Sequence, residues 1–144
     1  MAPNRSVPGV GERFADRYYD GIGYGVLIYP ENMIDGSPEG FACASCVDHT
    51  SFLPFPVYNK VTLDQEDNVF ELLADGLKVF EYNAGTRASI CKAVAEATRF
   101  IYFRSGDILA VELSGRKVID LPENGIGFTG YYCDNKTLDF RIIR

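Results

Sequence analysis

The chain has 144 residues, of which 14 are basic and 20 are acidic, so its formal net charge is −6 at pH 7. This length is enough for one domain with a sizeable core, and the charge balance leaves no run of Lys and Arg that could follow a phosphate backbone. No apolar stretch reaches the roughly 18 residues of a membrane-spanning helix. We therefore expect neither nucleic acid as a partner nor a membrane span.

The N-terminal residues 1–23 mix prolines and glycines with charged and aromatic side chains. This composition predicts an extended arm, and residues 24–144 are predicted to form the folded domain that follows it. The segment lacks the apolar centre of a secretory signal, so we expect a virion or cytoplasmic location. Four cysteines are too few for a disulfide scaffold, and we expect them to be free thiols.

The first predicted elements of the domain are short and widely spaced. Residues 24–29 are predicted to form a strand, and residues 57–63 a second one. Between them, residues 31–56 contain five prolines and glycines and show no clear apolar period, so we predict a long loop. Loops of that length inside a compact domain are generally functional, or they contain an element that the pattern hides.

A β-hairpin is the sharpest local prediction. Two runs rich in strand-forming residues, 68–74 and 77–82, are separated by Asp75 and Gly76. Asp-Gly favours a type I′ turn because both of its central positions need a positive φ. The next segment, 86–98, is compatible with a short helix or with a strand, and both alternatives stay open.

The last third of the chain consists of apolar-alternating runs divided by turn residues, at 99–103, 108–113, 128–133 and 138–143. Such alternation is typical of an antiparallel sheet with one face in water. It predicts a buried face made by Leu109, Val111, Phe128, Leu138, Phe140 and Ile142. The predicted fold class is therefore all-β, an antiparallel β-sandwich or jelly roll with an extended N-terminal arm.

Three features along residues 58–133 resemble the C1q/TNF-like jelly-roll domain. Phe70 stands six residues before Gly76, which opens an aromatic strand; a Gly-Asp turn at 106–107 separates two apolar runs; and 128–132 reads Phe-x-Gly-aromatic-aromatic. The resemblance implies a compact homotrimer whose faces bind partners without catalysis.

One group of residues has the spacing of a metal site. Cys43, Cys46 and His49 could place three ligands around a zinc ion, with Cys91 or Cys133 as a distant fourth. Structural zinc sites usually contain a second pair of ligands nearby, and no such pair follows here. We expect no metal and no cofactor, although the spacing of the two cysteines is also compatible with redox chemistry or a disulfide.

The histidine count also bears on catalysis, because His49 is the only histidine of the chain. A metalloenzyme built on a jelly roll holds its metal with two or three histidines, and a nucleophilic triad would have to recruit this one residue. No strand–turn–helix elbow surrounds it. We expect no enzymatic activity and no catalytic residue.

Aromatic residues are abundant, with nine tyrosines and ten phenylalanines, and they exceed what one small sandwich hides. Tyrosine suits half-buried interfaces. The candidate interface residues are Phe14, Tyr18, Tyr19, Tyr24, Tyr131 and Tyr132.

These observations favour a non-enzymatic structural or binding subunit that acts by self-association as a homo-oligomer, with a trimer favoured. A capsid decoration, fibre or receptor-binding protein of a virus or phage fits this description, and a capsid or other protein shell is a possible partner. Two different functions stay open beside it. One is a small zinc- or thiol-dependent protein centred on Cys43, Cys46 and His49, and the second is a cytosolic ligand-binding β-sandwich.

Overall fold

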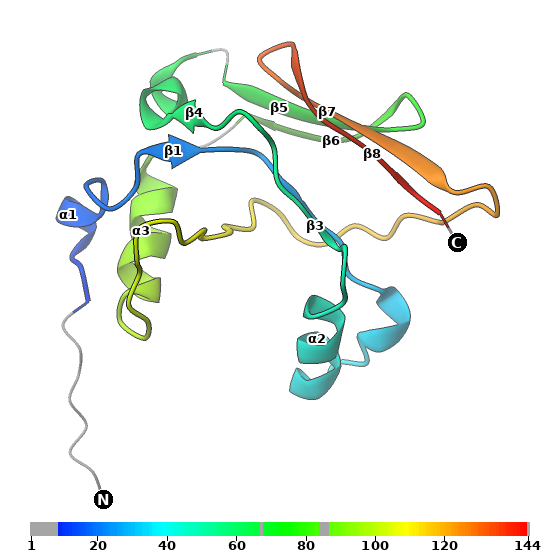
Figure 1. The fold of residues 1–144 in the computed structure, drawn as a ribbon, viewed down its shortest axis with the longest axis horizontal. Coiled ribbons are helices and arrows are strands. Elements are labelled where there is room, and N and C mark those ends of the chain that lie inside the picture. Colours follow the sequence, from blue (N-terminus) through cyan, green and yellow to red (C-terminus); the bar gives the residue numbers. More distant parts are fainter. Residues whose placement is uncertain (1–8, 67, 84–86, 144) are drawn as a thin grey trace, which may run out of the picture. The chain divides into compact units, whose positions relative to one another are not determined.

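The computed structural model describes residues 9–66, 68–83 and 87–143 (Figure 1). These residues fall into two compact units. Each unit draws on three separate stretches of the chain. Unit 1 contains the described residues of 1–22, 58–68 and 83–115, and unit 2 those of 23–57, 69–82 and 116–144.

The fold is predominantly β, and the described residues contain eight strands in antiparallel sheets and few helices. In unit 1 the elements are α1 (Glu12–Ala15), β1 (Gly21–Ile22), β4 (Tyr58–Asn59), the 3-10 helix η2 (Lys60–Asp64) and α3 (Arg87–Ala97). In unit 2 they are β2 (Val26–Leu27), the 3-10 helix η1 (Glu31–Met33), α2 (Pro38–Ser45), β3 (Ser51–Phe52), β5 (Val69–Ala74), β6 (Leu77–Asn83), β7 (Ile126–Tyr132) and β8 (Asn135–Ile142).

Unit 2 is organised around a four-stranded sheet with the strand order β6-β5-β7-β8 (Figure 1). The predicted hairpin is confirmed: β5 and β6 flank Asp75 and Gly76, whose φ angles of 45° and 82° are both positive as a type I′ turn requires. The amide of Asp75 donates to the carbonyl oxygen of Gly127 at 2.8 Å, and the amide of Gly127 donates to the Asp75 carboxylate at 2.9 Å. The turn is thereby joined to β7.

The inner face of this sheet carries the core of unit 2. Alternate residues of β5 and β7 are buried, among them Phe70 and Phe128. Residues from outside the sheet cover this face: the Tyr24 ring stacks on Phe70 with centroids 5.0 Å apart, and Phe52 of β3 stacks on Phe140 at 3.7 Å. Period-2 alternation has thus placed one set of side chains in the core, as it does in half-buried sheets.

Unit 1 is built on the packing of α1 against α3 (Figure 1). Ala15 of α1 is fully buried, and the amide of Val10 donates to the hydroxyl of Thr98 at 3.0 Å. The short strands β1 and β4 pair with each other in the same unit. Residues 9–22 of the predicted arm therefore lie folded within unit 1, and residues 1–8 are outside the described residues.

For 31–56 a long loop is wrong, and the alternative that the segment contains hidden elements is the one observed, because η1, α2 and β3 lie in it. Helix α2 begins with Ser37 as N-cap, whose hydroxyl accepts from the amide of Gly40 at 2.9 Å, and with Pro38 in its first turn. Ser followed by Pro is a helix-start signal, but two turns are too short for an apolar period to show.

The predicted strands at 99–103 and 108–113 are also wrong, since both segments lie in no helix or strand. Segment 86–98 is resolved in favour of the helix, α3, over its described residues. Beyond Ala97 the amides of Phe100 and Ile101 still donate to the Ala97 carbonyl, at 3.0 and 3.1 Å. The backbone that the strand prediction needed at 99–101 is therefore used by the end of the helix.

The other predicted strands are present with altered lengths. Residues 24–29 contain only the two residues of β2, and 57–63 contain β4 followed by η2, whereas 128–133 and 138–143 largely coincide with β7 and β8. Of the residues predicted to form the buried face, Phe128 and Leu138 are buried. The remaining ones are only half-buried: Leu109, Val111, Phe140 and Ile142.

Candidate functional site: an exposed apolar surface on unit 1

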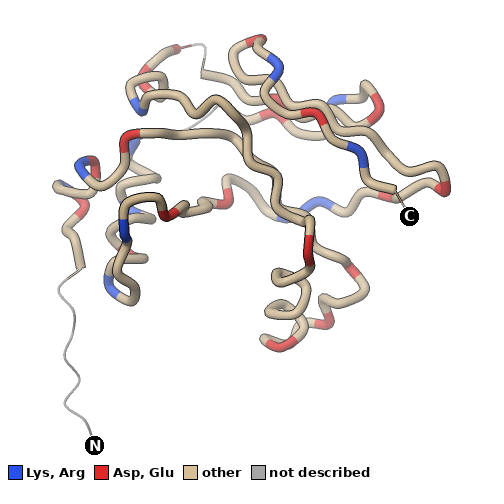
Figure 2. The backbone as a smooth tube through the Cα atoms, in the orientation of Figure 1, with Lys and Arg blue, Asp and Glu red and all other residues tan. Residues whose placement is uncertain are grey.

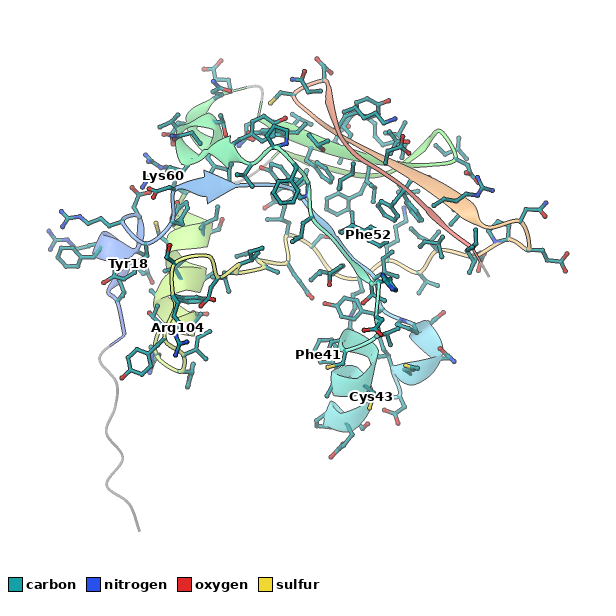
Figure 3. All side chains as sticks on the ribbon, in the orientation of Figure 1. Tyr18, Phe41, Cys43, Phe52, Lys60 and Arg104 are labelled. Carbon is teal, nitrogen blue, oxygen red and sulfur yellow. The ribbon has the colours of Figure 1, made fainter. Side chains whose placement is uncertain are left out.

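A network of charged side chains fixes the N-terminal part of unit 1. The Asp16 carboxylate, directly after α1, lies 3.1 Å from the Lys60 ammonium of η2 and 3.3 Å from the Arg87 Nε of α3. Lys60 also donates to the backbone carbonyl of Asp16, and Arg87 contacts Asp64 at 3.1 Å. Figure 3 shows Lys60 beside this part of the chain. One carboxylate therefore ties together three elements that are distant in sequence.

The same network shifts two protonation equilibria. Hydrogen bonding from Lys60, followed by the charges of Arg87 and Lys60, lowers the pKa of Asp16 below its usual value. Burial, and then the neighbouring Cys91 and Asp16, raises the pKa of Tyr19 to about 12. Tyr19 donates to the Asp16 carboxylate at 3.3 Å, and the Lys60 ammonium lies 5.3 Å from the centre of its ring.

These shifts hold each group in one protonation state near neutral pH. Asp16 stays charged and Tyr19 stays neutral, which suits an ion-pair network that holds elements in place. General acid–base catalysis instead needs a group whose pKa lies near the working pH. The cluster therefore joins the end of α1 to η2 and α3 through ion pairs.

Unit 1 also exposes large apolar side chains in two segments, one at α1 and one after α3. On and after α1, Phe14 and Tyr18 are 52% and 59% exposed. After α3, Phe100 and Tyr102 are 82% and 78% exposed, and Ile101 and Ile108 are exposed as well. Figure 3 marks Tyr18 beside α1 and Arg104 in the segment that follows α3. Clusters of exposed apolar residues commonly mark interaction sites in proteins, whereas single ones need no explanation.

Basic side chains accompany this apolar surface. The guanidinium groups of Arg13 and Arg17 lie 6.0 and 5.7 Å from the centre of the Phe14 ring, and that of Arg99 lies 6.0 Å from the Phe100 ring. Arginine and aromatic residues are the side chains most enriched at protein interfaces. The composition of the surface therefore fits association with another protein.

The predicted interface residues fall into two groups. Phe14 and Tyr18 are exposed, and Tyr19 and Tyr131 are half-buried. Tyr24 and Tyr132 are buried in the core of unit 2, where their rings lie 4.8 Å apart, so the interface prediction is corrected for these two. The prediction included these two residues because it rested on tyrosine content, which does not indicate the strand face on which a residue lies.

Phe100, Ile101 and Tyr102 were not among the predicted interface residues. The sequence pattern predicted a strand at 99–103, because aromatic and β-branched residues favour strands. A signal was available in their position directly after the helix-compatible segment 86–98. There the amides of Phe100 and Ile101 hydrogen-bond to the last residue of the helix and are not available to a strand.

The cysteines and the histidine that have the spacing of a metal site, Cys43, Cys46 and His49, lie on the surface of unit 2. Cys43 is on α2, Cys46 ends that helix, and both are exposed, as is His49 with its positive φ of 60°. Figure 3 labels Cys43 on α2. Cys133 is half-buried in unit 2, and Cys91 is half-buried in unit 1. Within the described ranges, no three Cys, His, Asp or Glu residues form a group able to hold a metal ion.

In the described part of the chain, no helix combines the length and the apolar character that crossing a membrane requires. The chain matches no protein-family model, no curated protein and no solved structure.

Proposed function

We propose that this protein is a non-enzymatic structural or binding subunit that acts by self-association. The observation that carries the proposal is the set of large apolar side chains that unit 1 exposes after α3, Phe100, Ile101, Tyr102 and Ile108. Burying an aromatic side chain removes roughly 150–250 Å² of surface from water, so leaving several exposed is unfavourable unless a partner covers them.

For the architecture, we propose that the four-stranded sheet of unit 2 is one layer of a sandwich-type fold. The second layer would begin with the segments that carry Tyr24 and Phe52, whose rings already cover the inner face of the sheet. Two packed layers around one core are the usual solution for a sheet with a single apolar face.

For the biological role, we propose a capsid decoration, a fibre or a receptor-binding protein of a virus or phage. Proteins of these kinds work by contact with other subunits and need no catalytic site. The resemblance to C1q/TNF-like jelly rolls supports a trimer as the assembled form. The acidic net charge of −6 fits a protein that binds other proteins rather than nucleic acid.

Sedimentation velocity at tens of micromolar tests self-association directly. We expect the wild-type chain to sediment as an oligomer. The double variant Phe100→Ser with Tyr102→Ser should associate more weakly, with a dissociation constant at least about tenfold higher, which corresponds to about 1.4 kcal/mol. Phe55→Ser is the matched control, because Phe55 is similarly exposed but belongs to unit 2. A monomeric wild-type chain at these concentrations would refute the proposal.

A further inference from the structure

Residues 108–113 have the exposure pattern of a strand that rests on the protein with one face. Ile108, Ala110 and Glu112 are exposed, whereas the alternate residues Leu109, Val111 and Leu113 are half-buried. A period of two in exposure is expected where an extended segment rests one face on the protein and turns the other to solvent. Yet no described residue from 98 to 125 lies in a helix or strand.

The turn that precedes this segment is already formed. The amide of Asp107 donates to the carbonyl oxygen of Arg104 at 3.1 Å, and the amide of Arg104 donates to the Asp107 carboxylate at 2.8 Å. Gly106 has a φ of +98°, which glycine adopts without strain. The direction in which residues 108–113 leave the turn is therefore fixed before any partner binds.

The edges of the sheet in unit 2 carry charges that this segment lacks. On the edge strand β6, Lys78 pairs with Glu81, and on the edge strand β8, Lys136 pairs with Asp139. Figure 2 colours the basic and acidic residues along the backbone of this sheet. Charged side chains on edge strands discourage pairing with other chains. Segment 108–113 contains a single charged residue, Glu112, in six.

We propose that segment 108–113 pairs in antiparallel fashion with the same segment of a second copy of this chain. The inference rests on the proposed self-association and specifies its contact. Backbone hydrogen bonds would join the two segments, as in other cases of strand addition between proteins. The two-fold axis of such a pair is perpendicular to the plane of the two strands, so equivalent faces of the two copies lie on the same side. The half-buried residues Leu109, Val111 and Leu113 of both copies would therefore form one continuous apolar stripe.

The charge pattern favours a second copy in this orientation. Parallel in-register pairing would place Glu112 beside the Glu112 of the other copy, and like charges directly opposite each other are destabilising. Antiparallel pairing centred on Ala110 or Val111 separates the two carboxylates along the strand. The edge strands β6 and β8 are less suitable partners, because their charged side chains discourage pairing with another strand. A two-fold contact predicts an even number of copies, so a trimer of the kind that the resemblance implies would have to pair with a second trimer through 108–113.

Hydrogen exchange on the wild-type chain tests the pairing without any substitution. As the concentration rises from monomer to oligomer, we expect the amides of 108–113 to exchange at least about tenfold more slowly, because they become hydrogen-bonded across the contact. The amides of the neighbouring residues 114–121 are the internal control and should change little. Unchanged exchange at 108–113 in an oligomer that sedimentation confirms would overturn the pairing and leave the proposed self-association standing.

A cysteine scan tests the register. In a chain whose four native cysteines are replaced by serine, each of residues 108–113 is changed in turn to cysteine, and the protein is oxidised with copper–phenanthroline. Antiparallel two-fold pairing places one residue opposite its own copy, with Cα atoms about 4.5–5.5 Å apart and within disulfide range. Residues two positions away are separated by about 13 Å and should not cross-link.

We therefore expect one maximum of covalent dimer within 108–113, at Ala110→Cys or Val111→Cys. Uniform cross-linking, or a maximum outside the segment, would overturn the proposed register. An odd-numbered assembly such as a trimer without protection at 108–113 would also overturn the two-fold contact but agree with the proposed function. A monomer would refute both.

Discussion

Two regions of this protein have the same alternating sequence pattern and reach different structures. In unit 2, the runs at 128–133 and 138–143 largely become β7 and β8, which pair from Ile126 to Tyr132 with one register shift after Gly130 and bury Phe128 and Leu138. In unit 1, the runs at 99–103 and 108–113 lie in no strand and expose several of their apolar residues.

The difference lies in the availability of a partner backbone. Strand β7 has β5 on one side and β8 on the other, so its amides and carbonyls are paired within the chain. The first run of unit 1 begins within the last turn of a helix, and the second follows the turn at 104–107 without pairing in a sheet. Alternation thus determines which residues share a face, whereas pairing decides whether that face forms a sheet.

The largest expected effect is a difference in the free energy of unfolding between matching truncations in the two regions. Phe128 is buried and its ring lies 5.2 Å from Phe140, so Phe128→Ala should lower the free energy of unfolding by about 3–5 kcal/mol. The same truncation at the exposed Phe100 should change it by less than about 0.5 kcal/mol. Urea denaturation measures both, at concentrations where the chain is monomeric. Equal losses would mean that Phe100 is part of a core and that the two regions do not differ.

A glycine series should show how strongly the turns around the sheet are constrained. Gly125 has a φ of 76°, and a Cβ there would collide with the carbonyl oxygen of Ile142, so Gly125→Ala should be the most destabilising. Gly76 has a φ of 82° but open space around it, and Gly76→Ala should cost about 1–2 kcal/mol through backbone strain.

Gly115→Ala is the matched control for this series. Its Cβ would also point into open space, and its φ lies outside the left-handed region, so we expect a change within about 0.5 kcal/mol. Thermal or urea unfolding gives the order of the three variants. A Gly76→Ala variant as stable as Gly115→Ala would contradict the type I′ turn.

The pH dependence of unit 1 should be sensitive to Asp16. Because the pKa of Asp16 is lower in the folded chain than in the unfolded one, its ion pairs stabilise the fold above the unfolded pKa, and this contribution is lost as the pH falls through the folded pKa. Asp16→Asn should therefore be less stable than the wild type at neutral pH, and the difference should vanish in acid. Asp120→Asn is the control, since among the described residues the structure shows no ion pair for this exposed carboxylate. A difference that persists in strong acid would show that Asp16 acts by packing.

The smallest expected effect is at alkaline pH. The pKa of Tyr19 rises from 10.0 to about 12 on folding, so the unfolded chain loses this proton before the folded chain does. Stability conferred by the neutral phenol is complete below pH 10 and is lost as the pH rises to about 12. Tyr19→Phe should flatten this part of the stability profile, measured by urea denaturation, and should remove one late-titrating tyrosine from the ultraviolet absorbance of tyrosinate. An unchanged titration curve would contradict the shift.

The hairpin, β7 and β8 could be predicted from the sequence because their information is local. Asp75 and Gly76 specify the turn, and alternation specifies which side of each strand is buried. The ambiguity at 86–98 could not be resolved in this way, because the segment is short and only Ile90, Val94 and Ala97 indicate a helical face. The division into two units was beyond reach for a related reason: it depends on which distant segments pack together.

The candidate surface could be predicted only in part. Tyrosine content indicated an interface, and Phe14 and Tyr18 are indeed exposed, but Tyr24 and Tyr132 pack together in the core. The exposed run at Phe100 was hidden by its own strand-like composition. Ser37 and Pro38 did contain the signal for α2, which shows that a helix start can be informative even where no apolar period follows.

The chain passes back and forth between the two units, each of which is assembled from three separated stretches. During synthesis, unit 1 cannot be completed before residue 115 has left the ribosome, and unit 2 must wait for β8. No single cut releases either unit as a contiguous fragment. Most of the ordering entropy must therefore be lost before the long-range contacts form, which makes slow folding the expected behaviour of the newly made chain.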